Sequence, residues 1–476
     1  MAADVATLPN PEHVIWILRK ESTGNAAYEI LSLEETEQEG KPSFALRRSS
    51  YPTSDGSESN QALQGLLDDF GIGDLLAHLN PSPQRRLHVV VSTLSGTGLS
   101  TQFYDNVLAP LLEVFGLTAA ASEESAQGSY HLLTTQNAES VKKFSENLAK
   151  RSHSEPNVGH TVVLLSGDGG VIDMLNGYAD SADASASLPL IAILPLGTGN
   201  ALFHSLHKGA QTPPASSDLV KGLRTLLRGR SAPLPSFKVE FPAGSRTITY
   251  SETTDPAPTG NNSTEAKTDS APSLGEHTEH VSHLYGVVVA SYGFHSQLVW
   301  ESDTPEYRKH GAKRFHMVAE QLLKESHAYR ATVEISRSSP SSSSITNGEK
   351  IYEKLHRDEH AYILATTVSN LEKTFCISPA SQPLDGQLRL VHFGPVDGAR
   401  TMGIMMAAYD GGKHVGMDDV GYDEIDEIRI TTHEEDAKWR KVCIDGTIVE
   451  IPAGERMVVR KEARRHLRVL VDESTV

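Results

Sequence analysis

The sequence predicts a parallel α/β domain followed by a mostly antiparallel β-sandwich domain. Between residues 85 and 230, strand-like apolar runs alternate with helical stretches, which is the pattern of a parallel sheet with helices on both faces. From residue 231 onward, short β-type runs follow one another with few helical stretches, which favours an antiparallel sandwich. A length of 476 residues also fits two domains better than one.

Residues 1–84 come before the alternating pattern, and their short apolar runs predict a few strands. The first domain, residues 85–230, opens with LHVVVS, an apolar run of the kind that forms a buried strand. The stretch that contains Pro110 is expected to be helical despite the proline. We expect strands at 87–92, 129–134, 161–166 and 190–194, and helices at 101–115, 138–150, 170–178, 200–207 and 217–227.

The second domain, residues 231–476, is expected to be a β-sandwich with two solvated inserts. The inserts, 252–280 and 336–348, are rich in Ser, Thr, Pro and Asn, a composition that forms flexible loops. Helices are expected only at 306–323 and 401–409. The expected strands lie at 237–241, 246–251, 284–291, 331–335, 361–367, 388–393, 427–432 and 441–444.

Composition limits the classes of function. Lys and Arg number 43 against 61 Asp and Glu, a net charge of −18, which argues against nucleic-acid binding. The two cysteines, Cys376 and Cys443, provide neither a disulfide framework nor a zinc site. There is no signal-peptide pattern, and no apolar stretch reaches the roughly 20 residues that span a bilayer. We therefore expect a soluble cytoplasmic protein whose contact with membranes is peripheral.

Three glycine-rich turns follow predicted strands of the first domain: LSGTG at 94–98, SGDGG at 166–170 and PLGTGN at 195–200. Glycine lets backbone N–H groups approach a phosphate, and the dipole of a following helix favours the same negative charge. Because the carboxyl ends of parallel strands lie at one edge of a sheet, the three turns predict a single anion-binding cradle. Tight packing between strands and helices is the alternative explanation for any one of these glycines.

Asp168 places a carboxylate in the middle of a turn that suits phosphate. This is electrostatically unfavourable unless a cation is present, and Mg²⁺ is commonly held by one or two carboxylates together with phosphate oxygens. The carboxylate could instead accept the proton of an attacking hydroxyl group. A third reading is a helix cap at Gly170.

The order of these motifs resembles the catalytic domain of diacylglycerol kinases and sphingosine (long-chain-base) kinases. SGDG is followed by VIDMLNG, in which Asp173 stands where the family has Glu, and then by LPLGTGNALFHSL. In the second domain, GFHSQLVWESDTPEYRKHGAKRF at Gly293–Phe315 is similar to a segment of sphingosine and ceramide kinases. VCIDGTIVE resembles the C-terminal D-G-E motif of the family. The resemblance covers residues 85–471.

The resemblance implies a lipid kinase that uses ATP and Mg²⁺. Asp168 would be the catalytic base or the magnesium ligand, and Arg308 and Arg314 would hold phosphates as planar, bidentate donors. A surface salt bridge with Glu301 or Glu306 is the alternative for these arginines. Carried over position by position, the ATP-binding residues are Ser95, Gly96, Thr134, Ser166, Gly167, Gly169, Thr198, Gly199, Arg308, Arg314, Asp445 and Gly446.

Several positions depart from the family pattern. Ser92-Thr93 replaces Asn-Pro in the first turn, and Thr447 replaces the glutamate of D-G-E. Gln297 stands where sphingosine kinases have the aspartate that holds the amine of the lipid. The leading hypothesis is an ATP-dependent lipid kinase most like a sphingoid long-chain-base kinase. The alternatives are a diacylglycerol- or ceramide-type kinase and a catalytically impaired relative that binds nucleotide or lipid. The expected partner is a membrane lipid, not nucleic acid, and homodimer formation is left open.

Overall fold

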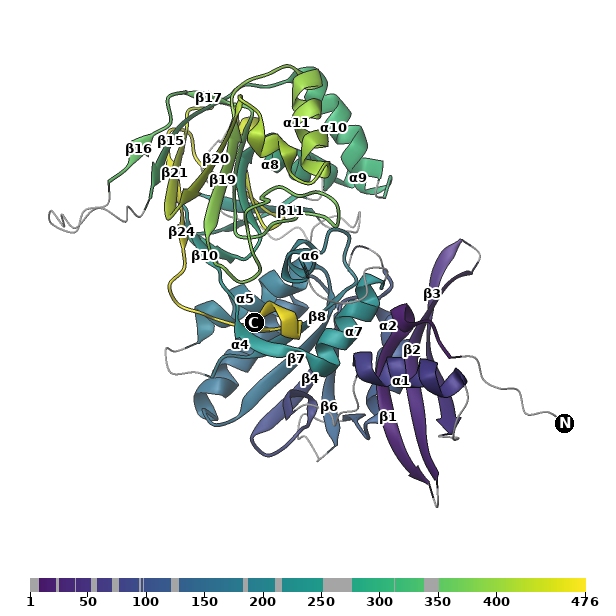
Figure 1. The fold of residues 1–476 in the computed structure, drawn as a ribbon. Coiled ribbons are helices and arrows are strands. Elements are labelled where there is room, and N and C mark those ends of the chain that lie inside the picture. The colour runs from purple at the N-terminus through teal and green to yellow at the C-terminus, as the bar shows by residue number, and fades with distance from the viewer. Residues whose placement is uncertain are drawn as a thin grey trace. The chain divides into compact units, whose positions relative to one another are not determined.

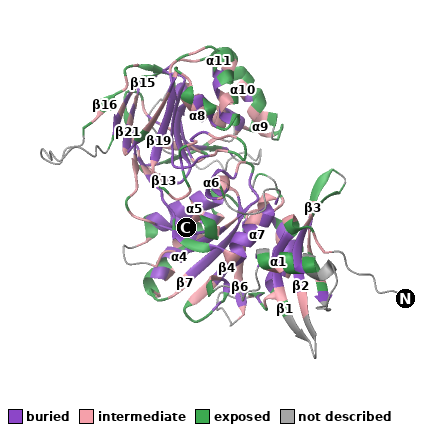
Figure 2. Ribbon diagram, viewed as in Figure 1, coloured by how far each residue is buried: buried purple, intermediate pink, exposed green. Residues whose placement is uncertain are grey.

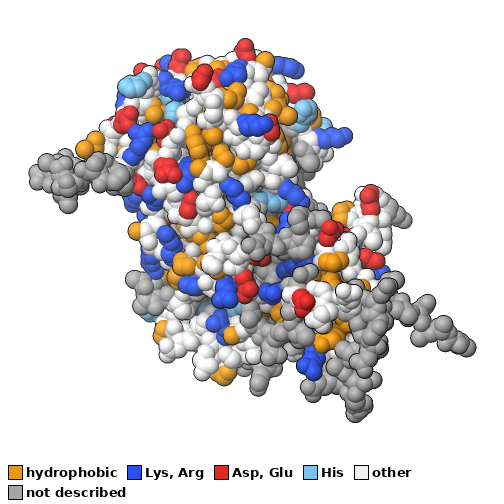
Figure 3. Space-filling model, viewed as in Figure 1, with side chains coloured by type: hydrophobic (Ala, Val, Ile, Leu, Met, Phe, Trp, Pro, Cys, Tyr) orange, Lys and Arg blue, Asp and Glu red, His pale blue; other side chains and the backbone are white. Residues whose placement is uncertain are grey.

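The computed structural model contains the expected α/β part and antiparallel β part (Figure 1). It forms two compact units, Met1–Leu234 with Arg464–Val476, and Pro235–Ala463. Figure 3 shows charged side chains of both signs scattered over the face that it draws. The residues that the structure describes are 8–22, 25–38, 40–52, 58–70, 77–93, 96, 98–120, 128–182, 187–209, 216–250, 276–311, 313–337 and 351–476.

A seven-stranded sheet in the order β5-β6-β4-β7-β8-β25-β9 forms the centre of the first unit. Neighbouring strands are parallel, except that β9 runs antiparallel to β25 at one edge. Consequently, the carboxyl ends of β6, β4, β7 and β8 lie side by side. The strands are β4 (Arg85–Val91), β5 (Thr118–Ala120), β6 (Ser129–Thr134), β7 (Gly159–Ser166), β8 (Leu190–Pro195), β9 (Arg230–Pro233) and β25 (Arg468–Val471).

Both faces of this sheet are covered, which is why its central strand β7 is buried along almost its whole length (Figure 2). Leu87 and Val89 of β4 face a core that includes residues of α3 and α7. His88 points to the opposite face, where its ring contacts Phe144 of α4. The helices are α2 (Ser100–Phe103), α3 (Ala109–Val114), α4 (Ser140–Ser154), α5 (Asp168–Ser181), α6 (Ala201–Leu206) and α7 (Asp218–Arg228).

The helix expected at 101–115 is present but contains one π-helical turn, Tyr104–Leu108, between α2 and α3. Proline has no N–H group, and in a regular helix its ring would collide with the carbonyl four residues earlier. Pro110 lies in the first turn of α3, where neither problem arises. The change of helix type therefore accommodates the proline.

Residues 14–70 form a three-stranded antiparallel sheet and a helix that belong to the first unit. One face of this sheet joins the core of the large sheet through Ile15 and Leu31, and the other packs against the helix through Ile17 and Leu66. The buried Arg224 of α7 donates hydrogen bonds to backbone carbonyls of this region. The elements are β1 (Val14–Ser22), β2 (Asn25–Gln38), β3 (Lys41–Pro52) and α1 (Glu58–Phe70).

The second unit is a sandwich of two antiparallel sheets, as expected. One sheet has the order β13-β10-β24-β21-β15-β16, with β17 also paired to β15. Its strands are β10 (Phe237–Glu240), β13 (His283–Gly286), β15 (Tyr329–Ser336), β16 (Glu353–Lys354), β17 (Glu359–His360), β21 (Glu427–Thr432) and β24 (Arg456–Lys461). Side chains from both sheets, such as Val333 of β15 and Ile363 of β18 (Tyr362–Thr366), form one buried core.

The other sheet of the sandwich has the order β12-β11-β23-β22-β14-β18-β19-β20. Three helices of this unit occur where the sequence has GFHSQLV, KRFHMVA and GARTMGI, and a short α9 precedes the second of them. The strands are β11 (Arg246–Tyr250), β12 (Glu276–His280), β14 (Val289–Gly293), β18 (Tyr362–Thr366), β19 (Leu388–Phe393), β20 (Val420–Ile425), β22 (Lys441–Ile444) and β23 (Thr447–Glu450), and the helices are α8 (Phe294–Ser302), α9 (Pro305–Arg308), α10 (Lys313–Glu325) and α11 (Gly398–Tyr409).

The structure corrects two expected boundaries: the C-terminal end of the second domain and the end of its first insert. Residues 464–476 were assigned to the sandwich, but β25 lies between β8 and β9 of the first unit, where Val469 and Leu470 are buried. The insert expected at 252–280 ends in strand β12, which pairs with β11 and exposes most of its polar side chains. The sequence of an apolar strand does not reveal which sheet the strand joins. A polar edge strand lacks the alternation of apolar and polar residues by which a strand is recognised. The remainder of this insert, 252–275, and residues 338–348 of the other lie outside the described residues.

Within the described residues, no helix combines the length and the apolar character needed to cross a bilayer.

Three histidines lie together inside the first unit, on the face of the large sheet that α4 covers. The ring nitrogens His88 Nε2 and His160 Nδ1 are 3.1 Å apart, and the ring centroids of His88 and His131 are 5.7 Å apart. Burial is the main cause that lowers the pKa of His88 well below its ordinary value and that of His160 to about 4. The positive charges of Arg86 and Arg151 act in the same direction, and Glu155 opposes them at His160.

This histidine cluster predicts a loss of stability in mild acid. Below pH 6.5 the unfolded chain binds protons at His160 that the folded chain refuses until about pH 4, so stability falls as pH drops through this window. For His160 alone the loss between pH 7 and pH 5 is about 2 kcal/mol. Urea unfolding of the wild type and of His160→Gln at both pH values measures it. An equal pH dependence in the two proteins would contradict the assignment.

Candidate functional site

The three glycine-rich turns meet at the carboxyl ends of β4, β7 and β8. A Cβ atom on Gly167 would lie 2.8 Å from the Cα of Gly197, and one on Gly197 would lie 2.3 Å from the Cα of Gly167. A Cβ on Gly96 would lie 2.1 Å from the Oγ1 of Thr198. The turns after β4, β7 and β8 are therefore in direct contact, and close packing accounts for these three glycines.

Gly169 differs from these three glycines because packing does not require it. A Cβ at this position would meet nothing within 4 Å, and its φ lies outside the left-handed region. It is exposed in the first turn of α5, next to Asp168. Glycine costs stability in a helix, so its presence here fits a ligand that approaches the backbone closely.

Three backbone N–H groups at this edge are available to an anion. Within the described part of the chain, no acceptor pairs with the amides of Gly169, Thr198 or Gly199. Gly169 lies at the N-terminus of the fourteen-residue helix α5, where the helix dipole favours negative charge. These N–H groups and the dipole could bind phosphate oxygens.

The carboxylate of Asp168 bridges two of the turns. Its Oδ2 accepts a hydrogen bond from Ala201 N at 2.8 Å, and its Oδ1 accepts one from Leu202 N at 3.0 Å. Burial raises the pKa of Asp168, and the two backbone N–H groups lower it. The side chain does cap a helix, as one sequence reading suggested, but the helix is α6 and not its own. Each oxygen keeps a lone pair for a proton or a metal ion.

Asn200 closes the third turn and was not among the predicted site residues. It has left-handed backbone geometry, with φ 51°, and its Oδ1 accepts from Gly197 N at 3.0 Å. Its Nδ2 donates to Gly197 O at 3.0 Å. These two hydrogen bonds close the turn and leave Thr198 and Gly199 on its outer side. Asparagine is one of the few residues that adopts this conformation readily, which is the signal that sequence reasoning could have used.

The end of β4 is tied to the end of β6 by a pair of threonines that sequence reasoning also missed. The Oγ1 of Thr93 donates to Thr135 O at 3.0 Å, and the backbone N–H of Thr93 donates to Thr135 Oγ1, also at 3.0 Å. Thr93 is half of the pair that replaces Asn-Pro, so this departure has a structural role. Thr134 lies exposed at the end of β6, and Ser166 is buried at the end of β7. Ser95 lies outside the described residues.

The segment after the aspartate packs α5 against α4. A Cβ on Gly177 would lie 2.5 Å from the carbonyl oxygen of Lys142, and Ser145 Oγ donates to Met174 O at 2.6 Å. Burial, with the nearby charge of Glu139, raises the pKa of Asp173 to about 7. This close helix pair fixes the direction in which the N-terminus of α5 points.

In the second unit, Arg308 and Arg314 converge as expected, but on a carboxylate. Arg308 Nη2 lies 2.7 Å from Asp303 Oδ2 and its Nε 3.1 Å from Oδ1. Arg314 Nη1 lies 3.4 Å from the same Oδ1. The salt-bridge alternative named Glu301 or Glu306, and the structure identifies Asp303 as the partner. The role of the two arginines in phosphate binding stays a prediction.

Asp445 and Gly446 form the two-residue turn between β22 and β23. Both have positive φ, 49° and 93°, which is the geometry that Asp-Gly favours in a hairpin. The Asp445 carboxylate accepts from Val287 N at 2.6 Å and Val288 N at 3.0 Å, and also from Val289 N. These bonds connect the hairpin to the start of β14. They explain both residues structurally, and a nucleotide contact at this position stays a prediction.

Gln297 is fully buried on α8. Its Nε2 donates to Glu301 Oε1 at 2.8 Å, one helical turn further along. Its Oε1 has no hydrogen-bond partner among the described residues, and Glu301 is itself only 9% exposed. Lys438 Nζ lies 3.9 Å from the same carboxylate. The predicted lipid-contact residue is thus paired with a buried carboxylate, and one of its acceptor atoms is unused.

The residues around Asp168 fit a magnesium ion that is held mainly by its substrate. Among the described residues, no group of three or more His, Cys, Asp or Glu side chains could hold a metal by itself. Mg²⁺ is usually bound by one or two carboxylates together with phosphate oxygens and water. A single carboxylate next to free N–H groups is consistent with that arrangement.

Comparison with known proteins finds a family similarity within the first unit. Residues 86–230 match the family model described as the diacylglycerol kinase catalytic domain. No curated protein sequence matches the chain. Three solved structures from Bacillus anthracis str. Sterne, described as diacylglycerol kinases and in two cases provisionally so, align with 83% of this chain and 100% of each of theirs. Their sequence identities are 14%, 12% and 13%, and their TM-scores are 0.46, 0.45 and 0.45.

Proposed function

We propose, on the premise that residues 86–230 match a diacylglycerol kinase catalytic domain, that this protein transfers the γ-phosphate of ATP to the hydroxyl group of a lipid. The observation that carries the proposal is the meeting of three turns around Asp168. The N–H groups of Gly169, Thr198 and Gly199, which have no acceptor among the described residues, belong to the same two turns as a carboxylate that is held in place by two hydrogen bonds. This arrangement supplies phosphate binding and a fixed negative charge together.

Each part of the cradle has a role in phosphoryl transfer, which depends mainly on positioning and on charge neutralisation. The N–H groups and the N-terminus of α5 would bind the phosphates of ATP. A Mg²⁺ ion held by Asp168 would neutralise charge on the transferred group. The free lone pair of Asp168 would hold the lipid hydroxyl or accept its proton, and burial, by raising the pKa of this carboxylate, favours proton acceptance.

We further propose that the lipid is a sphingoid base whose amine is recognised by Gln297 and Glu301 together. An ammonium group buried without a carboxylate is costly, and Gln297 by itself offers no charge. The unused Oε1 of Gln297 and the carboxylate of Glu301 are both acceptors, and both are buried. A neutral lipid such as diacylglycerol would bring no positive charge to the unused Oε1 of Gln297.

The test of this proposal is the ratio of transfer rates to sphingosine and to diacylglycerol in mixed micelles with labelled ATP. Replacing Glu301 with Gln is expected to lower the ratio about tenfold or more, because a hydrogen-bonded charge is lost. Gln297→Asp is expected to raise it by adding a carboxylate. Glu320→Gln, which removes an exposed charge on α10, is the control. An unchanged ratio in both variants would move amine recognition elsewhere, and transfer to neither lipid would favour a relative that only binds.

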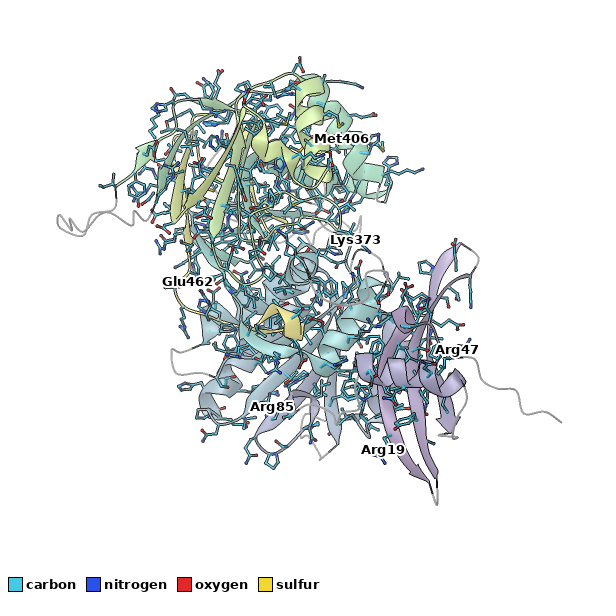
Figure 4. All side chains as sticks on the ribbon, in the orientation of Figure 1. Arg19, Arg47, Arg85, Lys373, Met406 and Glu462 are labelled. Carbon is cyan, nitrogen blue, oxygen red and sulfur yellow. The ribbon has the colours of Figure 1, made fainter. Side chains whose placement is uncertain are left out.

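The membrane association that a lipid substrate requires is proposed to involve α10 and α11. Met402, Met406 and Tyr409 occupy one face of α11 and are 36%, 56% and 43% exposed (Met406 is labelled in Figure 4). Met317 of α10 is 38% exposed, and α10 meets the start of α11. Within the described residues, the exposed Lys313 of α10 forms no ion pair. Apolar side chains together with an exposed lysine suit the surface of an anionic membrane.

Sedimentation with vesicles of phosphatidylcholine and phosphatidylserine tests this surface. The double change Met402→Ser and Met406→Ser is expected to lower the binding constant about tenfold or more, because each methionine would lose apolar burial. Ile351→Ser is the matched control, since Ile351 is 83% exposed and lies outside both helices. Equal losses in the variant and the control would assign no special role to α11.

A further inference from the structure

The turn between α8 and α9 holds an ion-pair cluster with two cations and one anion. Asp303 is the residue that follows α8, and its carboxylate receives both nitrogens of one edge of Arg308, at 2.7 and 3.1 Å. The remaining Nη1 of Arg308 donates to Tyr250 O at 3.2 Å. Arg314 adds a longer bond of 3.4 Å to the same carboxylate and lies over the ring of Phe315. A carboxylate therefore occupies the donor edge that a phosphate would use.

The cluster is accessible to a soluble anion. The side chains of Asp303, Arg308 and Arg314 are 40%, 29% and 25% exposed. Ion pairs at this level of exposure are weak, because water and salt screen them. A phosphate that carries more charge than a carboxylate can therefore displace Asp303 from the two guanidinium groups.

The position of Asp303 does not depend on its carboxylate. Its backbone N–H donates to Trp300 O at 3.1 Å, and the next residue, Thr304, is held through N–H and Oγ1 by the carbonyl of Glu301. Removing the charge of Asp303 should therefore leave the turn between α8 and α9 in place.

An exposed lysine lies next to the cluster in the sequence. Lys309 follows Arg308 and forms no ion pair within the described residues. Its positive charge attracts an incoming phosphate, and Asp303 opposes the entry of that phosphate by repulsion as well as by occupying the donors.

We propose that Asp303 is an internal competitor for phosphate at Arg308 and Arg314 and that it holds the affinity for nucleotide below the level that the arginines alone would provide. The inference rests on the proposed ATP-dependent function and on the prediction from the sequence that these arginines hold phosphates of the nucleotide. A competitor that must be displaced lowers the apparent affinity of every phosphate ligand by the same factor. When the product ADP leaves, Asp303 pairs with the arginines again, and this competition speeds product release.

The experiment is calorimetric titration of the full chain with ATP and magnesium, and separately with tripolyphosphate, for the wild type, Asp303→Asn and Glu306→Gln. Glu306 is an exposed carboxylate three residues away that has no ion pair among the described residues, so it controls for the loss of one negative charge. We expect Asp303→Asn to bind both anions about three- to tenfold more tightly, with the same factor for each, and Glu306→Gln to change little.

Weaker binding in Asp303→Asn, with an unchanged melting temperature, would overturn the inference, because Asp303 would then orient the arginines. Unchanged binding, or an equal gain in Glu306→Gln, would overturn it as well. A failure of the proposed function would give a different result from a failure of this inference. If tripolyphosphate binding tightens in Asp303→Asn while ATP binds to none of the proteins, the competition stands and the assignment as an ATP-dependent kinase falls.

Discussion

Replacing Asp168 with asparagine is expected to lower phosphoryl transfer by about two to four orders of magnitude. Loss of a positioned proton acceptor has an effect of about this size, and the loss of a magnesium ligand acts in the same direction. The structure adds a second consequence. One of the two acceptors for Ala201 N and Leu202 N becomes an NH₂ group, which cannot accept, so the first turn of α6 loses a cap worth about 1 kcal/mol.

Initial rates with saturating ATP and lipid, together with urea unfolding, measure both effects of Asp168→Asn. Asp218→Asn is the matched control, because Asp218 is also the first residue of a helix in the same unit and its carboxylate forms a long ion pair of 3.8 Å with Lys221. We expect the control to keep a rate within about twofold of the wild type, as surface changes usually have small effects. Near-normal turnover in Asp168→Asn would show that this carboxylate is only a cap for α6.

Adding one methyl group to different glycines of the cradle is expected to have opposite effects on stability. Gly197→Ala would place its Cβ 2.3 Å from the Cα of Gly167, so backbone must move, at a cost of about 3 kcal/mol and with loss of the cradle. Gly169→Ala meets nothing within 4 Å and removes a glycine from α5, so the protein should gain up to about 1 kcal/mol. Its ATP affinity should nevertheless fall about tenfold, because the methyl group would block the approach of phosphate to the backbone.

Thermal unfolding and calorimetric ATP titration of the two glycine variants distinguish packing from ligand approach. Gly65→Ala, at a position of α1 that is also open, is the control for helix propensity and should gain stability without any change in ATP affinity. Undiminished ATP binding by Gly169→Ala would remove Gly169 from the site. Full stability in Gly197→Ala would show that the turns after β7 and β8 can separate.

The parts of the fold that the sequence predicts well are those where burial follows a simple pattern. The expected strands 388–393, 427–432 and 441–444 coincide with β19, β21 and β22, whose apolar residues form the sandwich core. Helix α8 was missed because the residues it buries are polar, Gln297 and Glu301 among them, so no apolar stripe exists to detect. Hydrogen bonds from Ser296 to backbone carbonyls and from Gln297 to Glu301 hold these buried polar groups, and such bonds leave no periodic signal in the sequence.

The candidate site was predicted as a set of residues, but their separate roles depend on contacts that sequence alone does not contain. The partners of the Asp168 carboxylate lie 33 and 34 residues further along the chain. Gly167 and Gly169 are the same residue type two positions apart, and only the position of Gly197 shows that one is needed for packing and the other is not. Likewise, the carboxylate that occupies Arg308 and Arg314 is Asp303, and neither of the two glutamates considered from the sequence.

The return of the chain to the first unit through β25 determines the order in which the two units can be completed during synthesis. β25 lies between β8 and β9, and the whole of residues 235–463 separates β9 from it. The ribosome therefore synthesises all of the sandwich before it synthesises β25, which is the sixth strand, in spatial order, of the sheet that carries the cradle. Until then β8 and β9 have unpaired edges, which are sites for aggregation and for chaperone binding. The sandwich can therefore fold before β25 completes the sheet that carries the cradle.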